Sequence, residues 1–434
     1  MNTDESGLGL PGGLWPAQLT GTDVELLLRE ESVGQLGNGL YALADVAERH
    51  VAEYDELSAA DVAARSVSAQ SLPPDIRELA AQRMAGMLAD FEQDWDGRIA
   101  ALAPDDVGEV PDPFGWAAER FGGRPDAHID ALAAAFTELP RSRSSLGYLV
   151  QYAAAAGRDP RLPAMRRALL VTTVSSAELI LSGVIHRVLF DREGGSWQSP
   201  SLDKAVNKLM AGGIEKWETR FPEILGIDLP RTSCNLTAVK EIWARRNVLV
   251  HNGGIADQKY CRRVSGVAPG TLLEVSAEYL RTAIDLVCGF LFGIIYIAWG
   301  VAPGRRQFVA YRAAGNAVVA ESEHRWPMAE NLNAIAAFLE TDLDEAARSQ
   351  VNAWLARARW RGPDSVLADV SAWETIGLPP VFTVARLILA GQIDNAIAMI
   401  PQLVVQGELT DDDLLTWPLF EPVRNNSRFK QLLK

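Results

Sequence analysis

The sequence predicts a mainly α-helical protein, with a four-helix bundle at its centre and a helical domain on either side. Apolar residues recur at helical spacing along most of the 434 residues. Long apolar helical segments gather in the middle of the chain, as a bundle requires. The length suffices for two or three domains. We expect a flexible segment at 1–20, a helical domain at 21–145, the bundle at 160–305 and a helical domain at 306–434.

The composition is that of a globular protein, with 48% hydrophobic and 22% charged residues. The net charge is −15, from 56 acidic against 41 basic residues. An acidic chain is not built to coat nucleic acid nonspecifically, nor to lie on an anionic membrane surface. We therefore expect no DNA and no membrane as partner, and any contact with a nucleic acid must be local.

Cysteine usage and the first residues indicate a cytoplasmic protein. Cys234, Cys261 and Cys288 are too few and too scattered for a disulfide framework or a zinc site. The opening residues, MNTDESGLGLPGG, lack the basic segment of a signal peptide. The best candidate for a membrane span is 286–302, which is at the short limit for spanning and continues from an amphipathic segment. We expect it to be a buried helix of the bundle.

The N-terminal domain shows helical patterning from Asp23 to about Pro140. Segments such as 23–30 and 39–57 are expected as separate helices. His50 and His128 are lone histidines at expected helix ends, where such residues are typically caps or surface groups. We expect no catalytic residue in this domain.

The central block opens with a nearly uniformly apolar segment at 165–190. Between Arg167 and His186 the only charged residue is Glu178. A helix of that composition is expected to be buried nearly all round.

Three further helices are expected in this block, at 201–213, 235–251 and 273–299. Two short segments favour β-hairpins instead, 259–275 around a Pro-Gly turn and 306–321 around a central Gly-Asn. Beyond them the helical pattern returns. The stretch 379–407 is similar to one tetratricopeptide-like helix pair, and 417–433 is typical of a closing helix, although no repeat period recurs.

The stretch KEIWARRNVLVHNGG, residues 240–254, interrupts an otherwise regular amphipathic helix. Asn235 or Ser233 could cap the start of this helix, and the Asn-Gly-Gly that follows it supplies the stop. A sector of about 60° on the helix contains Leu236, Val239, Trp243 and Val250. Arg246 and Asn247 fall at the edges of this sector and break it. Arg245 falls nearly opposite, so we expect it to be in solvent.

His251 follows Asn247 by one helical turn, about 40° round, so the two side chains can touch. Arg246 and His251 converge only if the helix unwinds near His251. A guanidinium can hold phosphate oxygens in a two-point contact, and an imidazole can move a proton near neutral pH. The pattern also has a purely structural interpretation, because a histidine at a helix C-terminus is favoured electrostatically whatever its function.

The block at 160–305 resembles the HEPN superfamily, a group of α-helical bundles found in prokaryotic ribonucleases of toxin–antitoxin and antiviral systems. The resemblance lies in an apolar opening helix with one acidic residue (SSAELIL), in a later helix ending RNVLVHNGG, and in a final helix beginning SAEYLRTAIDLV. The family motif is an Arg, four to six further residues and a His, often with a polar residue after the Arg. Arg246, Asn247 and His251 match it.

The resemblance implies a metal-independent endoribonuclease without a cofactor. In active members two subunits face each other across a cleft, and the 2′-hydroxyl of the RNA attacks the phosphate, leaving a 2′,3′-cyclic phosphate. By this resemblance His251 transfers protons, Arg246 stabilises the phosphate, Asn247 orients it, and Glu178 pairs with Arg246. Expected partners are RNA, a second copy of the chain, and a regulatory or antitoxin protein.

Two other functions stay open. The superfamily also contains members that have lost activity and serve as binding or dimerisation modules, so a non-catalytic HEPN scaffold is the alternative. A tetratricopeptide-like adaptor is the third. The sequence holds no GxxxxGK, HExxH, paired CxxC or GxSxG motif. We therefore expect no metal and no cofactor, and expect any chemistry at 246–251.

Overall fold

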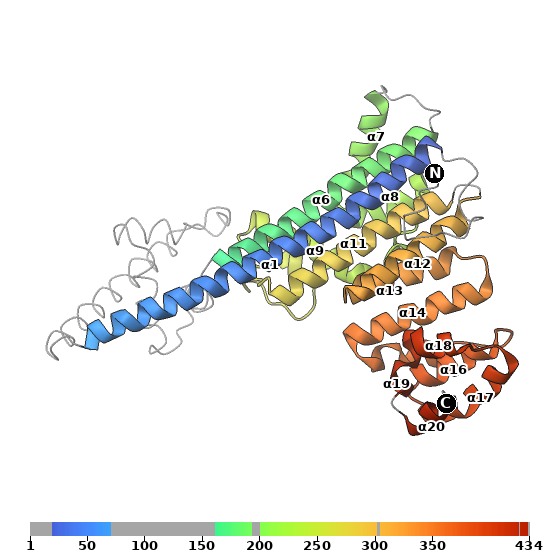
Figure 1. Cartoon of the computed structure of the whole chain (residues 1–434). Helices are drawn as coiled ribbons and strands as arrows, with labels where there is room; N and C mark the ends of the chain where they lie inside the picture. The colour runs from blue at the N-terminus through green and yellow to red at the C-terminus, as the bar shows by residue number, and fades with distance from the viewer. Residues whose placement is uncertain (1–19, 71–160, 193–199, 302–303, 425, 433–434) are drawn as a thin grey trace, which may run out of the picture. The chain divides into compact units, whose positions relative to one another are not determined.

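The computed structural model describes residues 20–70, 161–192, 200–301, 304–424 and 426–432 (Figure 1). Regular structure in these ranges is helical, and a single antiparallel bridge joins Ile255 to Leu272. The predicted mainly α fold is confirmed. Residues 1–19 of the flexible segment expected at 1–20, the helices expected between 71 and 145, and His128 lie outside the described residues.

The chain divides into two compact units. One comprises Met1–Ala42, Leu169–Leu273 and Ala277–Lys434, and the other comprises Leu43–Ala168 and Glu274–Ser276. Two helices contribute residues to both units, α1 (Gly21–Gln70) and α6 (Arg161–Arg192). Residues Ala277–Lys434, on both sides of position 306, all belong to the first unit.

The described part of the second unit is held by a two-point ion pair between its two helical segments. The Arg166 guanidinium of α6 donates to both carboxylate oxygens of Glu48 in α1, each at 2.7 Å. Planar two-point contacts of this kind fix orientation as well as distance.

Helix α1 is one continuous helix, where the sequence pattern predicted separate segments at 23–30 and 39–57. Gly34 and Gly37 lie between those two segments. Packing explains at least Gly37: a Cβ at this position would lie 2.7 Å from the Arg325 guanidinium and 3.3 Å from the Cys288 sulfur. The glycine therefore serves close packing rather than a turn.

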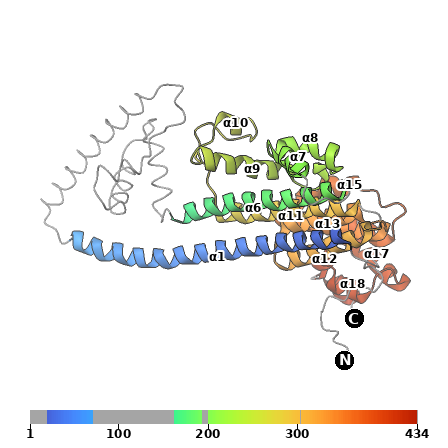
Figure 2. The ribbon, with the colours of Figure 1, turned by 90° about the horizontal axis from the view of Figure 1, so that it is seen from above.

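Helix α11 (Ala277–Gly300) is the core of the first unit, and from Ala283 onward every residue is buried. The first-unit part of α1 packs along it, and the Tyr296 hydroxyl of α11 donates to Glu30 at 2.8 Å. Figures 1 and 2 show α6 running along α1. Two described helical stretches are long and apolar enough to cross a membrane, 163–192 and α11, and the second is mostly buried within the structure. The expectation of a buried helix at 286–302 is confirmed for 286–300, whereas Val301 follows the helix and is 63% exposed.

Helix α6 is not buried nearly all round, so that prediction is wrong. Thr172, Ser175 and Leu179 form an exposed stripe, and Leu179 is 74% exposed. The absence of charge on this helix does not reflect full burial, because small hydroxyl side chains and one leucine occupy the uncovered face. An exposed leucine on such a face is a candidate interface residue.

Beyond α11 lie α12 (Arg306–Ser322), α13 (Trp326–Leu339) and α14 (Leu343–Arg361), of which α13 packs against the other two. The hairpin expected at 306–321 is wrong. Buried residues there recur at the three- and four-residue spacing of a helix: Val309, Ala313, Ala317 and Ala320. The Gly-Asn pair lies in mid-helix, where Asn316 donates to Glu30 at 2.6 Å.

The C-terminal elements share a core to which Ala347, Val351 and Trp354 of α14 also contribute. They are η2 (Pro363–Val366), α15 (Leu367–Ala372), α16 (Pro380–Leu389), α17 (Ile393–Gln406), α18 (Asp411–Thr416), η3 (Pro418–Phe420), α19 (Glu421–Arg424) and α20 (Ser427–Leu432). Helices α16 and α17 form the pair expected at 379–407. The closing helix expected at 417–433 is instead three short elements, because Pro418 and Pro422 restrict helix continuation.

Candidate functional site

The connection between α6 and α11 carries the candidate site. It contains α7 (Pro200–Met210), α8 (Ile214–Leu225), η1 (Leu229–Arg231), α9 (Leu236–His251) and α10 (Gln258–Cys261). Asn235 caps α9, since its side chain accepts a hydrogen bond from the Ala238 amide at 3.2 Å. The helix ends at the expected Asn-Gly-Gly, where the Gly254 amide donates to the Val248 carbonyl at 3.1 Å. Both predicted ends of α9 are confirmed.

The start of α9 is fixed to α11 and α13 by Asn331. Its side-chain amide donates to the carbonyls of Thr232 at 3.0 Å and Gly289 at 2.7 Å. Its oxygen accepts from the Cys234 backbone amide at 2.7 Å. The Thr232 carbonyl approaches α11 so closely that a Cβ at Gly293 would lie 2.0 Å from its oxygen. Buried, fully bonded contacts of this kind set the position of α9.

Trp243 anchors the middle of α9. The ring is 3% exposed and makes edge contacts with Trp217 and Phe290, at centroid distances of 6.0 and 5.9 Å. Val239 is buried as predicted, but Val250 is 49% exposed. In the last turn the buried side chain is Val248 instead, because the following loop folds back and packs against that side of the helix.

The Arg246 guanidinium lies against α6. One terminal nitrogen donates to Glu178 at 3.3 Å and to Ser175 at 3.4 Å, and the other donates to the Asn247 side chain at 3.0 Å. The expected pairing of Arg246 with Glu178 is therefore present. Glu178 also accepts from the Trp243 indole at 3.1 Å. The Arg246 Nε is buried without a hydrogen-bond partner, which leaves one donor of the guanidinium unused.

Arg245 is not in solvent, so that prediction is wrong. Its side chain is 15% exposed, its Nε donates to Glu241 at 2.7 Å, and its guanidinium lies 4.2 Å from the ring centroid of Tyr279. Burial lowers the pKa of Arg245, but the charges of Tyr279 and Glu241 raise it by more, so that the net shift is upward. A helical wheel omits the loop and α11, which cover this side of α9.

Glu241 gathers these groups into one polar cluster. It accepts hydrogen bonds from the hydroxyls of Tyr260 at 2.5 Å and Tyr279 at 2.6 Å. Burial raises the pKa of both tyrosines, and the Glu241 charge raises it further, so both stay protonated donors. We call Glu241, Arg245, Tyr260 and Tyr279 the Glu241 cluster. It attaches the loop after α9 to the helix itself.

His251 is the last residue of α9 and is exposed. Within the described ranges, no hydrogen bond or ion pair links it to Arg246. The unwinding on which their convergence depends does not occur, because α9 stays helical through His251. Arg246 contacts α6, whereas His251 lines a separate pocket. Asn247 contacts Arg246 and also lines that pocket.

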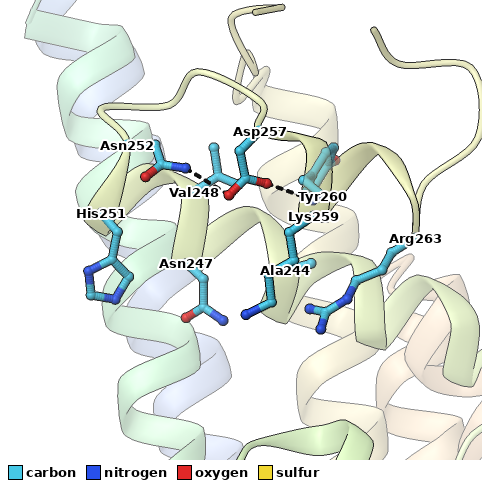
Figure 3. A pocket seen from close by; sticks show the side chains of 9 residues that line it. All are labelled: Ala244, Asn247, Val248, His251, Asn252, Asp257, Lys259, Tyr260 and Arg263. Atoms are coloured by element: carbon cyan, nitrogen blue, oxygen red, sulfur yellow. Dashed lines mark hydrogen bonds between the residues drawn. The ribbon is translucent and has the colours of Figure 1, made fainter. Parts of the chain in front are cut away.

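The pocket has a volume of about 180 Å³ and lies between α9 and the loop that follows it (Figure 3). Ala244, Val248 and Tyr260 are its buried residues. The other lining residues are polar or charged: Asn247, His251, Asn252, Asp257, Lys259 and Arg263. Arg246 is not among the lining residues.

The loop is not the hairpin expected at 259–275. Residues 258–261 form α10, and the Ala256 amide donates to the Thr271 carbonyl at 2.8 Å beside the single antiparallel bridge. Asp257 accepts from the Tyr260 amide at 2.7 Å, which holds the pKa of Asp257 below its usual value. Asp257 caps this short helix, and Tyr260 within it joins the Glu241 cluster.

Sequence reasoning did not single out Lys259 and Arg263. Neither belongs to a motif, and their relation to His251 depends on how the loop folds. One signal was available: between residues 252 and 273 the chain holds three basic residues and one acidic residue, the reverse of its overall balance.

Three comparisons with known proteins return no match: one with models of protein families, one with curated proteins and one with solved structures. In the part of the chain that the structure describes, no three His, Cys, Asp or Glu residues are grouped so as to hold a metal ion. The interpretation of the site therefore depends on its own geometry.

Proposed function

We propose that this chain is a metal-independent endoribonuclease of the HEPN type, cytoplasmic and working as a homodimer in toxin–antitoxin or antiviral defence. The observation that carries the proposal is the arrangement of Arg246, Asn247 and His251 along α9, with a partly exposed guanidinium held by Glu178. Such a set supplies an anion contact, an orienting amide and a proton-transfer group.

Arg246 is suited to a phosphate. Its side chain is 22% exposed and its distance to Glu178 is 3.3 Å, so the pair is accessible to a ligand. A phosphate oxygen could bind the terminal nitrogens, whose contacts with Asn247 and Ser175 lie at the surface, while Glu178 keeps the guanidinium oriented. Asn247 already contacts Arg246 and would add an amide donor to the same anion.

The proposed reaction is an internal transesterification. A histidine removes the proton of the ribose 2′-hydroxyl, and the 2′-oxygen attacks the adjacent phosphorus. The bond from phosphorus to the 5′-oxygen breaks, and that oxygen takes a proton from a second acid group. The products are a 2′,3′-cyclic phosphate and a 5′-hydroxyl. His251 from the two copies would supply the base and the acid, and Arg246 would stabilise the charge that develops on phosphorus oxygens.

A homodimer is supported by the divergence of Arg246 and His251 within one chain, since a second copy could bring its own His251 opposite Arg246. Apolar side chains flank the motif: Leu179, which follows Glu178, is 74% exposed and Val250 is 49% exposed. Exposed apolar residues around a polar centre are typical of an interface.

The alternative is a non-catalytic HEPN scaffold whose helical surfaces bind a partner protein. One observation favours it: the Arg246 charge is already partnered by Glu178 and does not meet His251. In that case the exposed leucine and valine would serve assembly alone.

Cleavage of RNA by the purified full-length chain tests the proposal, with and without EDTA, and with His251→Ala as control. The proposal predicts cutting that EDTA does not reduce and that His251→Ala nearly abolishes. RNA left intact by a folded, dimeric wild-type chain would support the scaffold instead.

A further inference from the structure

We propose that the pocket beside His251 is a subsite for a second phosphate of the RNA strand, next to the phosphate that is cut, with Lys259 as its principal contact. The inference rests on the proposed function for its ligand class. It adds a binding site that the Arg–His motif does not contain, built by the loop between α9 and α11.

The loop has a local charge opposite to that of the chain. Lys259, Arg262 and Arg263 are all exposed, and Asp257 is the only acidic residue from 252 to 273, in a chain of net charge −15. An acidic protein that binds a polyanion needs such a local cationic surface, because its overall field is repulsive.

Lys259 is the cation best placed to receive a phosphate. Arg263 already pairs with Glu215 at 2.7 Å. The Lys259 ammonium forms no ion pair within the described ranges; Lys259 lowers the pKa of Asp257 through its backbone amide and, less strongly, through its charge. Its ammonium offers three donors. It therefore has both the charge and the free hydrogen-bonding capacity that a phosphate requires.

The acidic group of the pocket lies away from the cations. Figure 3 shows Asn247, His251, Lys259 and Arg263 reaching toward one side, whereas Asp257 and Asn252 lie together at the other end. Both Asp257 oxygens are engaged, one by the Tyr260 amide at 2.7 Å and one by the Asn252 side chain at 3.1 Å. The Asp257 carboxylate is thus a structural acceptor, and an anion would enter on the cationic side.

The pocket is formed in advance of any ligand. Ala244, Val248 and Tyr260 are fully packed, and they share a small core with Ala256 and Leu273 of the loop. The Tyr260 hydroxyl donates a hydrogen bond to Glu241, which fixes the Tyr260 ring in place. A prearranged site binds without the entropy loss of ordering a flexible loop.

His251 links the two sites, since it belongs to the Arg–His motif and also lines the pocket. A single strand whose scissile phosphate lies at the motif continues past His251 in one direction. Its next phosphate would meet Lys259.

The test uses the full-length chain and a fluorescein-labelled octanucleotide with 2′-O-methyl groups, which cannot be cut. Binding is measured by anisotropy over a range of salt. Lys259→Gln should weaken binding about tenfold and lower the salt slope by about 0.7, the value for one phosphate contact on a single strand. Lys259→Arg should retain most of the affinity.

Lys240→Gln is the matched control, because Lys240 is on α9, outside the pocket, and pairs with Glu218 at 2.6 Å. It should leave affinity and slope unchanged. Cleavage gives a second readout: Lys259→Gln should reduce kcat/KM for an unmodified octanucleotide, but not for a dinucleotide that carries only the scissile phosphate.

The outcomes separate the two proposals. If the wild type binds and cuts RNA and Lys259→Gln matches it in affinity and slope, the subsite is wrong and the ribonuclease stands. If RNA binds in a Lys259-dependent way but is never cut, the subsite stands and the ribonuclease is wrong. A wild-type chain that neither binds nor cuts RNA overturns both.

Discussion

The first unit contains carboxylate–arginine pairs in two different settings. Asp23, Glu30 and Glu330 have side chains only 2–4% exposed, whereas the Glu178 side chain is 31% exposed. Each of these carboxylates accepts hydrogen bonds from an arginine and from a tyrosine or tryptophan. The residue types are the same in both settings. The pairs differ in how deeply the carboxylate is buried and in whether the arginine has a buried nitrogen without a hydrogen-bond partner.

The Glu30 pair shows the complete form. Glu30 accepts from Arg312 at 2.8 Å, from Asn316 at 2.6 Å and from Tyr296 at 2.8 Å. The Glu178 pair is longer, at 3.3 Å, and its arginine keeps a buried Nε without a partner. A buried, fully hydrogen-bonded pair stabilises the fold, whereas a partly exposed pair is accessible to a ligand. Substitutions in the Glu30 pair should therefore mainly lower stability, and substitutions in the Glu178 pair should mainly lower activity.

The largest effect is expected on catalysis. His251→Ala should reduce RNA cleavage by about 10²–10⁴-fold, the usual value of a positioned acid–base group. Arg246→Ala should cost as much or more, and Arg246→Lys should rescue it only in part, since lysine cannot make the two-point contact. Single-turnover cleavage measures these losses. Full activity in His251→Ala would rule out the mechanism.

The buried pair should respond in stability instead. Arg312→Ala leaves the buried Glu30 charge without its cation and should lower the free energy of unfolding by about 3–5 kcal/mol. Arg246→Ala removes a partly exposed pair and should cost about 1 kcal/mol or less. Chemical unfolding followed by circular dichroism compares the two. Equal losses in the free energy of unfolding would show that the two pairs do not differ in their contribution to stability.

The dimer face should be sensitive to charge. Leu179→Asp would place an unpaired carboxylate in the proposed interface, and at a cost of about 3 kcal/mol it should weaken the dimer on the order of a hundredfold. Cleavage should fall with it. Light scattering at micromolar concentration gives the assembly state, and a monomeric wild type would contradict the proposed interface.

Arg245→Ala sharpens the comparison between neighbours on α9. Its loss opens the Glu241 cluster and leaves partly buried acceptors unsatisfied, so stability should fall by about 1–3 kcal/mol. Activity should fall much less than in Arg246→Ala, because Arg245 lies away from the motif. Thermal unfolding and cleavage of the two variants, measured together, check this. Identical losses of activity in the two variants would show that Arg246 has no role in cleavage that Arg245 lacks.

The smallest expected effect is a loss of folding stability at low pH. Burial raises the pKa of Asp23, but the hydrogen bond from Arg305 and others from Thr20 and Trp299 outweigh it and lower the value to about 2. The folded pKa lies below the unfolded value, so this contribution is present above about pH 4 and is lost as the pH falls toward 2. Unfolding midpoints measured across this range should decline in the wild type and less steeply in Asp23→Asn.

Local features of the site could be predicted from the sequence. The ends of α9 follow from Asn235 and from the Asn-Gly-Gly stop, which act within a few residues of the helix. The pairing of Glu178 with Arg246 came from the family resemblance and is present. The prediction of a buried helix from 286 holds as far as Gly300, because a long run of apolar side chains is stable only when it is removed from water.

Features that depend on tertiary contacts could not be predicted. Arg245 is covered by Tyr260 and Tyr279, which are 15 and 34 residues away in the sequence. The Gly-Asn pair in α12 looks like a turn until Glu30 supplies a partner for Asn316. Lys259 reaches the pocket only because the loop folds back onto α9.

The central claim, metal-free cleavage by the RNA's own 2′-hydroxyl at the α9 motif, is tested most directly with one substituted substrate. The wild-type chain is given an RNA in EDTA, and its cut position and product ends are determined. The same RNA with a single 2′-deoxy nucleotide on the 5′ side of that position is then compared. The account predicts 2′,3′-cyclic phosphate and 5′-hydroxyl ends, and no cutting at the deoxy position. Cutting at that position, or cutting that requires added metal, would contradict it.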